Sequence, residues 1–118
     1  PRSTDEWVAL AWALKDDCQS AWTEEPPRTQ RCADVLAQIL QRVTEPQVAA
    51  AAAWCDGLAL LANGRMQDAM QRLDDAHGQL LALGQAQRAA QSQVPKVIAL
   101  SMPPGGHIVD PVGVTARG

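Results

Sequence analysis

The sequence predicts an all-α protein of about five antiparallel helices, and three observations lead to this fold class. Alanine and glutamine are abundant, Phe and Tyr are absent, and all four aromatic residues are Trp, a composition that suits helices packed through small side chains. Apolar residues recur every three or four positions in five successive segments. Breaks containing proline, glycine or asparagine separate these segments. A length of 118 residues fits one domain with a single modest core.

The first two helices are expected at about residues 5–22 and 28–43. The first carries acidic residues in its opening turn and an apolar stripe made of Trp7, Leu10, Ala11, Leu14, Cys18, Ala21 and Trp22. Pro26 and Pro27 stop it, because proline lacks a backbone donor and disfavours helical geometry in the residue before it. The second helix has the cleanest stripe in the chain, formed by Cys32, Val35, Leu36, Ile39, Leu40 and Val43.

The third helix is expected at about residues 47–62. Thr44 is the predicted capping residue, and Pro46 stands near the first helical position, where its missing N–H costs nothing. Gly64 supplies the left-handed geometry that commonly follows the last turn of a helix. A helix between these two signals is therefore the simplest interpretation.

The fourth and fifth helices are expected at about residues 65–83 and 85–101, with Gly84 closing the first of them. Pro95 lies inside the fifth pattern, where it costs about 3 kcal/mol or kinks the helix unless the helix begins there. Residues 102–118 lose the helical period and contain several prolines and glycines. We expect a helical domain over residues 1–101, followed by a flexible, irregular carboxyl-terminal tail.

Charge and cysteine content narrow the class of protein. A net charge of −3, with 19% charged residues, gives no basic excess of the kind that nucleic acids or anionic membranes select, so neither partner is expected. The longest apolar run, residues 48–55, is too short to span a bilayer, and the first residues lack the features of a signal peptide. Cys18, Cys32 and Cys55 have no disulfide-framework or metal-clamp spacing. A cytoplasmic protein is the expectation.

A repeat appears when the sequence is compared with itself. The pattern from Arg31 to Ile39 matches the one from Arg65 to Leu73 at an offset of 34, and the preceding helices align at about 40. The third and fourth helices resemble the tetratricopeptide-repeat (TPR) motif, whose recurring small and large apolar positions are occupied here by Gly57, Leu60, Gly64, Ala69, Leu73 and Ala76. The resemblance covers about residues 5–101. It is closest to the long-repeat arrays that precede effector domains in bacterial proteins such as CHAT proteases and maltose-regulator transcription factors.

The resemblance implies hairpins stacked as a short right-handed solenoid, with small residues allowing close helix approach. The first hairpin departs from the motif, with Asp17 at a glycine position and Pro26-Pro27 at the turn, and Asp56 stands at a usually apolar position of the second. A sixth helix would follow the fifth in a full array, whereas residues 102–118 contain several prolines and glycines and lack the helical period. A truncated array is one interpretation of that departure.

The binding groove of such arrays is lined by the first helix of each hairpin. Here the resemblance assigns the groove to Leu14, Cys18, Trp54, Leu58, Leu61, Val94 and Ile98. Trp54 is the expected anchor, since Trp is enriched among energetically dominant interface residues. The alternative is that Trp54 and Leu58 pack against neighbouring helices as core. The apolar fifth helix, without a sixth to cover it, also suggests a homodimer or a tail that folds back.

No catalytic site or metal centre is expected, and no cofactor. His77 on a helix and His107 in the tail have no evident partner, and the cysteines lie on apolar stripes, where buried thiols are usual. Paired acids at Asp16-Asp17 and Asp74-Asp75 point in different directions on a helix and have no third acidic ligand nearby. The predicted function is a protein-binding scaffold for a peptide or helix. The alternative is a structural fragment of a larger TPR-containing regulator or protease, without independent activity.

Overall fold

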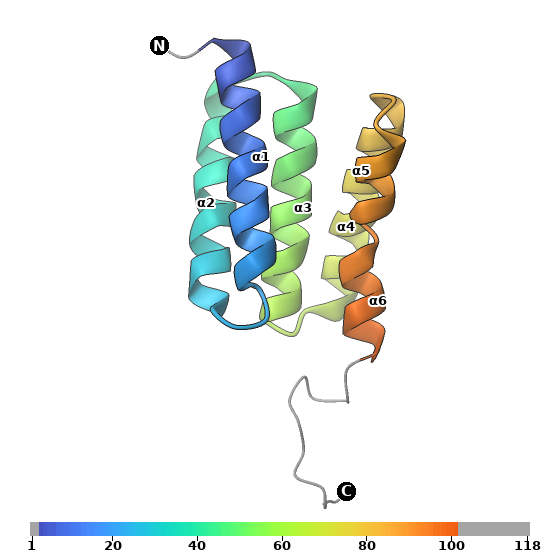
Figure 1. Ribbon diagram of the computed structural model, residues 1–118. Coiled ribbons are helices and arrows are strands. Elements are labelled where there is room, and N and C mark those ends of the chain that lie inside the picture. The colour runs from blue at the N-terminus through green and yellow to red at the C-terminus, as the bar shows by residue number, and fades with distance from the viewer. Residues whose placement is uncertain (1–2, 102–118) are drawn as a thin grey trace, which may run out of the picture.

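The computed structural model describes residues 3–101, which form six helices and no strand. In chain order these are α1 (Thr4–Ala21), α2 (Pro26–Arg42), α3 (Pro46–Ala62), α4 (Met66–Ala82), α5 (Ala86–Gln91) and α6 (Val94–Ser101) (Figure 1). The predicted all-α class is confirmed. The tail predicted at 102–118, with His107, lies outside the described residues.

The helix ends follow from local chemistry, with two corrections to the sequence prediction. Pro26 and Pro27 begin α2 instead of only ending the helix before it, because a missing N–H is harmless in the first turn. The cap of α3 is Glu45 rather than Thr44, and its side chain accepts a hydrogen bond of 3.2 Å from the backbone N–H of Gln47. Because Pro46 is the first residue of α3, the cap position falls on Glu45, the residue directly before it.

Glycines end the third and fourth helices as predicted. Gly64 and Gly84 have φ angles of +77° and +75°, a left-handed conformation that glycine adopts without steric cost. The amide after each glycine donates back to the preceding helix, from Arg65 to Leu60 and from Gln85 to Leu80, both at 2.9 Å. These two turns reverse the chain within a few residues and so set the antiparallel course of α3, α4 and α5.

The predicted fifth helix is broken into two. α5 ends at Gln91, and α6 begins at Val94, with buried Pro95 as its second residue. A proline cannot donate to the carbonyl four residues earlier, and its ring collides with that carbonyl, so a straight continuous helix is disfavoured here. The break leaves Ser92 buried, with its hydroxyl donating to the carbonyl of Ala89 at 2.6 Å.

The helices form a row of antiparallel hairpins, with α3 at the centre. α3 packs against α1, α2 and α4, while α5 packs against α4. In Figure 1, α1 and α2 lie at one side of the row and α5 and α6 at the other. Eleven residues of α3 are buried, and five of them are alanines, whose small side chains allow its neighbours to approach on several sides. The core therefore surrounds α3 and thins toward both ends of the row.

Gly57 determines how closely α3 and α4 approach. A Cβ atom built on Gly57 would lie 2.7 Å from Cγ of Leu73 on α4, closer than real Cβ contacts. The fully buried Leu73 side chain therefore occupies space that exists only because residue 57 has no side chain.

Candidate functional site

The seven residues of the predicted groove do not share one surface. Cys18, Trp54 and Leu58 are fully buried, and Leu61 is nearly so. Leu14 is half-buried and packs against the same core. The structure thus places the members on α1 and α3 in the interior, as the alternative interpretation of Trp54 and Leu58 held. The two members on α6, Val94 and Ile98, are exposed.

The burial of Trp54 is explained by a cluster of aromatic rings and cations. The rings of Trp12 and Trp54 meet edge to face, with centroids 6.1 Å apart. Lys15, only 8% exposed, holds its ammonium 4.2 Å from the centroid of the Trp54 ring and 2.7 Å from a carboxylate oxygen of Asp16. The indole face and one carboxylate oxygen thus surround the buried ammonium with favourable electrostatic contacts.

The same cluster joins the two sides of the row. The guanidinium carbon of Arg88 on α5 lies 4.0 Å from the centroid of the Trp12 ring on α1. The Trp12 indole N–H donates to the Gln47 side chain on α3 at 3.1 Å. Three helices therefore meet around one ring, and the groove that the sequence predicted here is filled by the protein's own side chains. Sequence reasoning missed this cluster, because nothing in the sequence indicates that Arg88 reaches Trp12.

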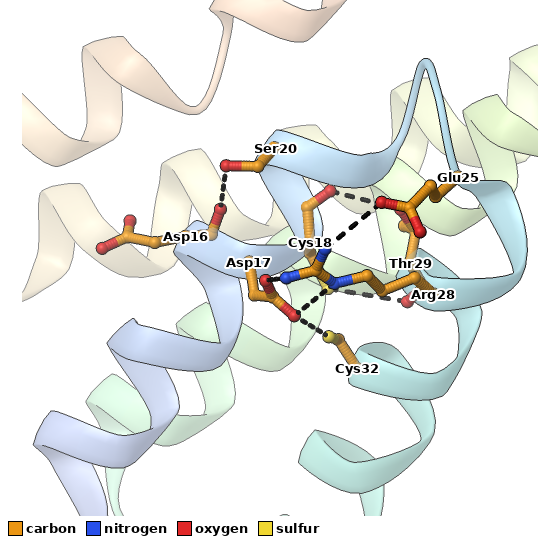
Figure 2. A network of polar contacts seen from close by, with 8 residues as sticks. All are labelled: Asp16, Asp17, Cys18, Ser20, Glu25, Arg28, Thr29 and Cys32. Carbon is orange, nitrogen blue, oxygen red and sulfur yellow. Dashed lines mark hydrogen bonds and ion pairs between the residues drawn. The ribbon is translucent and has the colours of Figure 1, made fainter.

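A polar network links α1 and α2 beside their buried contact. Figure 2 shows Asp17 of α1 facing Arg28 and Cys32 of α2. Its carboxylate accepts a 3.0 Å hydrogen bond from Nε of Arg28, pairs with the Arg28 terminal nitrogen, and accepts from the Cys32 thiol at 3.2 Å. The Arg28 hydrogen bond, followed by the Cys32 one, lowers the pKa of Asp17, and Asp17 in turn raises the pKa of Arg28. These contacts hold α1 and α2 together.

The three cysteines are free and buried, as predicted. Burial, helped by the bond to Asp17, raises the pKa of Cys32 to about 12, and burial also raises the pKa of Cys55. Cys18 donates its thiol to the carbonyl of Thr29 at 3.6 Å. The thiolate is the reactive form of cysteine, so the raised pKa of Cys32 and of Cys55 disfavours thiol chemistry at neutral pH.

The paired acids that the sequence offers as metal ligands on α4 form ion pairs in the structure. Asp74 pairs with Lys96 of α6, and Asp75 pairs with Arg72 of the same helix at 3.2 Å. Across residues 3–101, no group of three or more His, Cys, Asp and Glu side chains is arranged to hold a metal ion. His77 is half-buried on α4.

An apolar seam, the α6 face, remains on the surface. It consists of Val94, Val97 and Ile98, spaced by three and four residues so that they form one ridge. Val97 is 64% exposed, and Leu100 beside the ridge is 73% exposed. The opposite side of α6 is anchored, because Pro95 and Ala99 are buried and Lys96 is paired with Asp74.

A hollow opens at the other side of the row, between the first turns of α1 and the second half of α2. This α2 hollow has a volume of about 460 Å³ and is lined by Trp7, Val35, Gln38, Ile39, Gln41 and Arg42. Val35 is 42% exposed. The stripe on α2 that the sequence predicted as apolar is thus only partly used by the core, since Ile39 is buried and Val35 is not.

Comparison with known proteins returns nothing: no protein-family model, curated protein or solved structure matches this chain. Within the described part of the chain, none of the helices has the length and apolarity needed to cross a membrane.

Proposed function

We propose that this protein is a TPR-like interaction module that binds a helical protein segment on the α6 face. The observation that carries the proposal is the exposed ridge of Val94, Val97 and Ile98 on a helix whose other side is firmly anchored. Contiguous exposed apolar side chains are a feature of interaction sites in soluble proteins.

The second hairpin indicates what kind of segment would fit. There, α4 covers α3 with a stripe of small and large apolar side chains, Ala69, Leu73, Ala76 and Leu80, all fully buried. The α6 face has no equivalent cover within the described residues. An amphipathic helix running antiparallel to α6, with a similar stripe, would bury its ridge in the way that α4 buries α3.

Support for TPR-like stacking comes from the contact between Gly57 and Leu73. The resemblance places a small residue and a large one at these positions, and in the structure the large side chain fills the space that the glycine leaves. The left-handed turn at Gly64 is the second such feature.

The test uses a synthetic peptide with the sequence of residues 65–83, which contains α4, as a model of the covering helix. We expect fluorescence anisotropy to show saturable binding to the protein. Val97→Asp should weaken this binding about tenfold or more, because it brings a charge into an apolar contact. Leu81→Asp is the matched control, since Leu81 is a similarly exposed apolar residue of α4 outside the α6 face.

Two outcomes would contradict the proposal. One is the absence of saturable binding, which would favour the alternative of a structural fragment without independent activity. The other is binding that Val97→Asp leaves unchanged, because the peptide would then be exchanging with the protein's own α4. A peptide carrying Leu73→Asp, which breaks the apolar stripe, checks that the stripe is what binds.

A further inference from the structure

We infer that residues 108–114, the tail segment, return over the α6 face of their own chain and compete with a partner helix for its ridge. The tail segment lies outside the described residues and follows α6 in the sequence. This inference rests on the proposed function of the α6 face and adds the regulation of that site. A face covered by its own chain is open to a partner for only part of the time.

The composition of the tail segment matches the apolar character of the ridge. Asp110 is its one charged residue, and four of its residues are apolar and branched: Ile108, Val109, Val112 and Val114. The ridge is exposed and uncharged, since Lys96, the one charged residue of α6, pairs with Asp74. With Asp110 facing water, apolar side chains of both surfaces leave water together and no unpaired charge is buried.

The chain between α6 and the tail segment allows the return. Residues 103–106 are Pro-Pro-Gly-Gly, a composition typical of turns, and they follow closely after Ser101, the last residue of α6. The distance along the helix axis from Ser101 back to Val94 is about 10 Å, at about 1.5 Å per residue. An extended segment with the length of residues 108–114 spans about 20 Å. The tail segment is therefore long enough to lie along the whole ridge.

Attachment to the same chain lets a small contact form. The ridge consists of only three side chains, Val94, Val97 and Ile98. A segment joined to its target by a short connection meets it at an effective concentration of about 1 mM, so even a contact with a Kd of about 1 mM forms about half of the time. A free partner at micromolar concentration must then displace the tail segment. The segment thus sets a threshold for binding at the α6 face.

The test uses the full chain with one substitution in the tail segment. Ile108→Asp brings a charge to the ridge, and Thr115→Asp, just beyond the segment, adds the same charge as the matched control. Fluorescence anisotropy with the 65–83 peptide measures the affinity of the α6 face in each protein. We expect Ile108→Asp to raise this affinity about fivefold, which corresponds to a face covered in about four molecules of five. Thr115→Asp should leave the affinity unchanged.

A second measurement needs no peptide. Nuclear magnetic resonance should show different amide shifts for Val97 and Ile98 in Ile108→Asp and in the unsubstituted protein, and equal shifts in Thr115→Asp. These differences should be the same at low and high protein concentration. Differences that appear only at high concentration would indicate a contact between two copies and would overturn the inference.

The two measurements separate the failure of this inference from the failure of the proposed function. If the peptide binds Ile108→Asp and the unsubstituted protein equally well, the inference is overturned and the proposed function stands. If the peptide binds neither protein, the proposed function fails, and the shifts of Val97 and Ile98 decide whether the tail segment covers the ridge. Unchanged shifts would then overturn the inference as well.

Discussion

α3 and α6 are both apolar helices, yet one forms the core and the other forms surface. Eleven of the 17 residues of α3 are buried, compared with two of the eight in α6. α3 has α1, α2 and α4 around it, while α6 is attached to α4 by the pair of Lys96 with Asp74 and leaves Val97 in solvent. The apolar content of a helix therefore does not separate the core from exposed surface. The number of helices packed around it separates them.

The largest effect should come from removing a core tryptophan on α3. Trp54→Ala deletes a fully buried ring and leaves a cavity beside Lys15, so we expect a loss of about 3–5 kcal/mol in the free energy of unfolding, measured by urea denaturation. Leu100→Ala on α6, at a side chain 73% exposed, should change it by less than about 0.5 kcal/mol. Similar losses at the two positions would contradict the division between α3 and α6.

The next effect concerns the close contact of α3 with α4. Gly57→Ala places a methyl group 2.7 Å from Leu73, and overpacking of this kind costs about 1–3 kcal/mol. Gly78→Ala is the matched control, because Gly78 lies inside α4 with open space around its Cβ position. This variant should raise the free energy of unfolding by about 0.5–1 kcal/mol. Adding Leu73→Ala to Gly57→Ala should cost less than the sum of the two single changes, since the clash then disappears.

The smallest expected effect is the loss, on acidification, of the stability that Asp17 contributes at neutral pH. Its pKa is lowered in the folded protein, chiefly by the hydrogen bond from Arg28, so its stabilising effect is complete above the unfolded pKa and fades as the pH falls through the folded one. Asp17→Asn should therefore be less stable than the unsubstituted protein at pH 7. The difference should shrink below about pH 4. Asp34→Asn, at an exposed carboxylate bonded to Gln30, controls for loss of charge; an equal pH response in both variants would contradict the role of Asp17.

Local signals in the sequence were sufficient for most of the helices and turns. Apolar stripes located the helices, and Gly64 and Gly84 located the turns, because both features act over a few residues. Pro95 indicates a kink or a new start of the fifth helix, and in the structure α6 begins at Val94 beside it. The small-residue position at Gly57 also follows from sequence, since only glycine leaves space for Leu73.

The location of the predicted groove residues was harder to predict because it depends on contacts between distant parts of the chain. Trp54 became core rather than anchor because Trp12 and Lys15 pack against it, while Arg88, 76 positions away from Trp12, covers the latter ring. A single sequence does not show which of these side chains meet. Val94 and Ile98 were predicted for a shared groove with α1 and α3, and the structure separates them from it, because α6 lies at the end of the row.

Hydrogen exchange of the full chain, with and without the 65–83 peptide, tests most directly whether the α6 face is the binding surface. Without peptide, the amides of α3 should exchange slowest, because they open only with the whole core, and those of α6 should exchange faster. With saturating peptide, the account predicts slower exchange in residues 97–101 and unchanged exchange in α3. Protection that appears on α1 and α3 instead, with α6 unaffected, would contradict it.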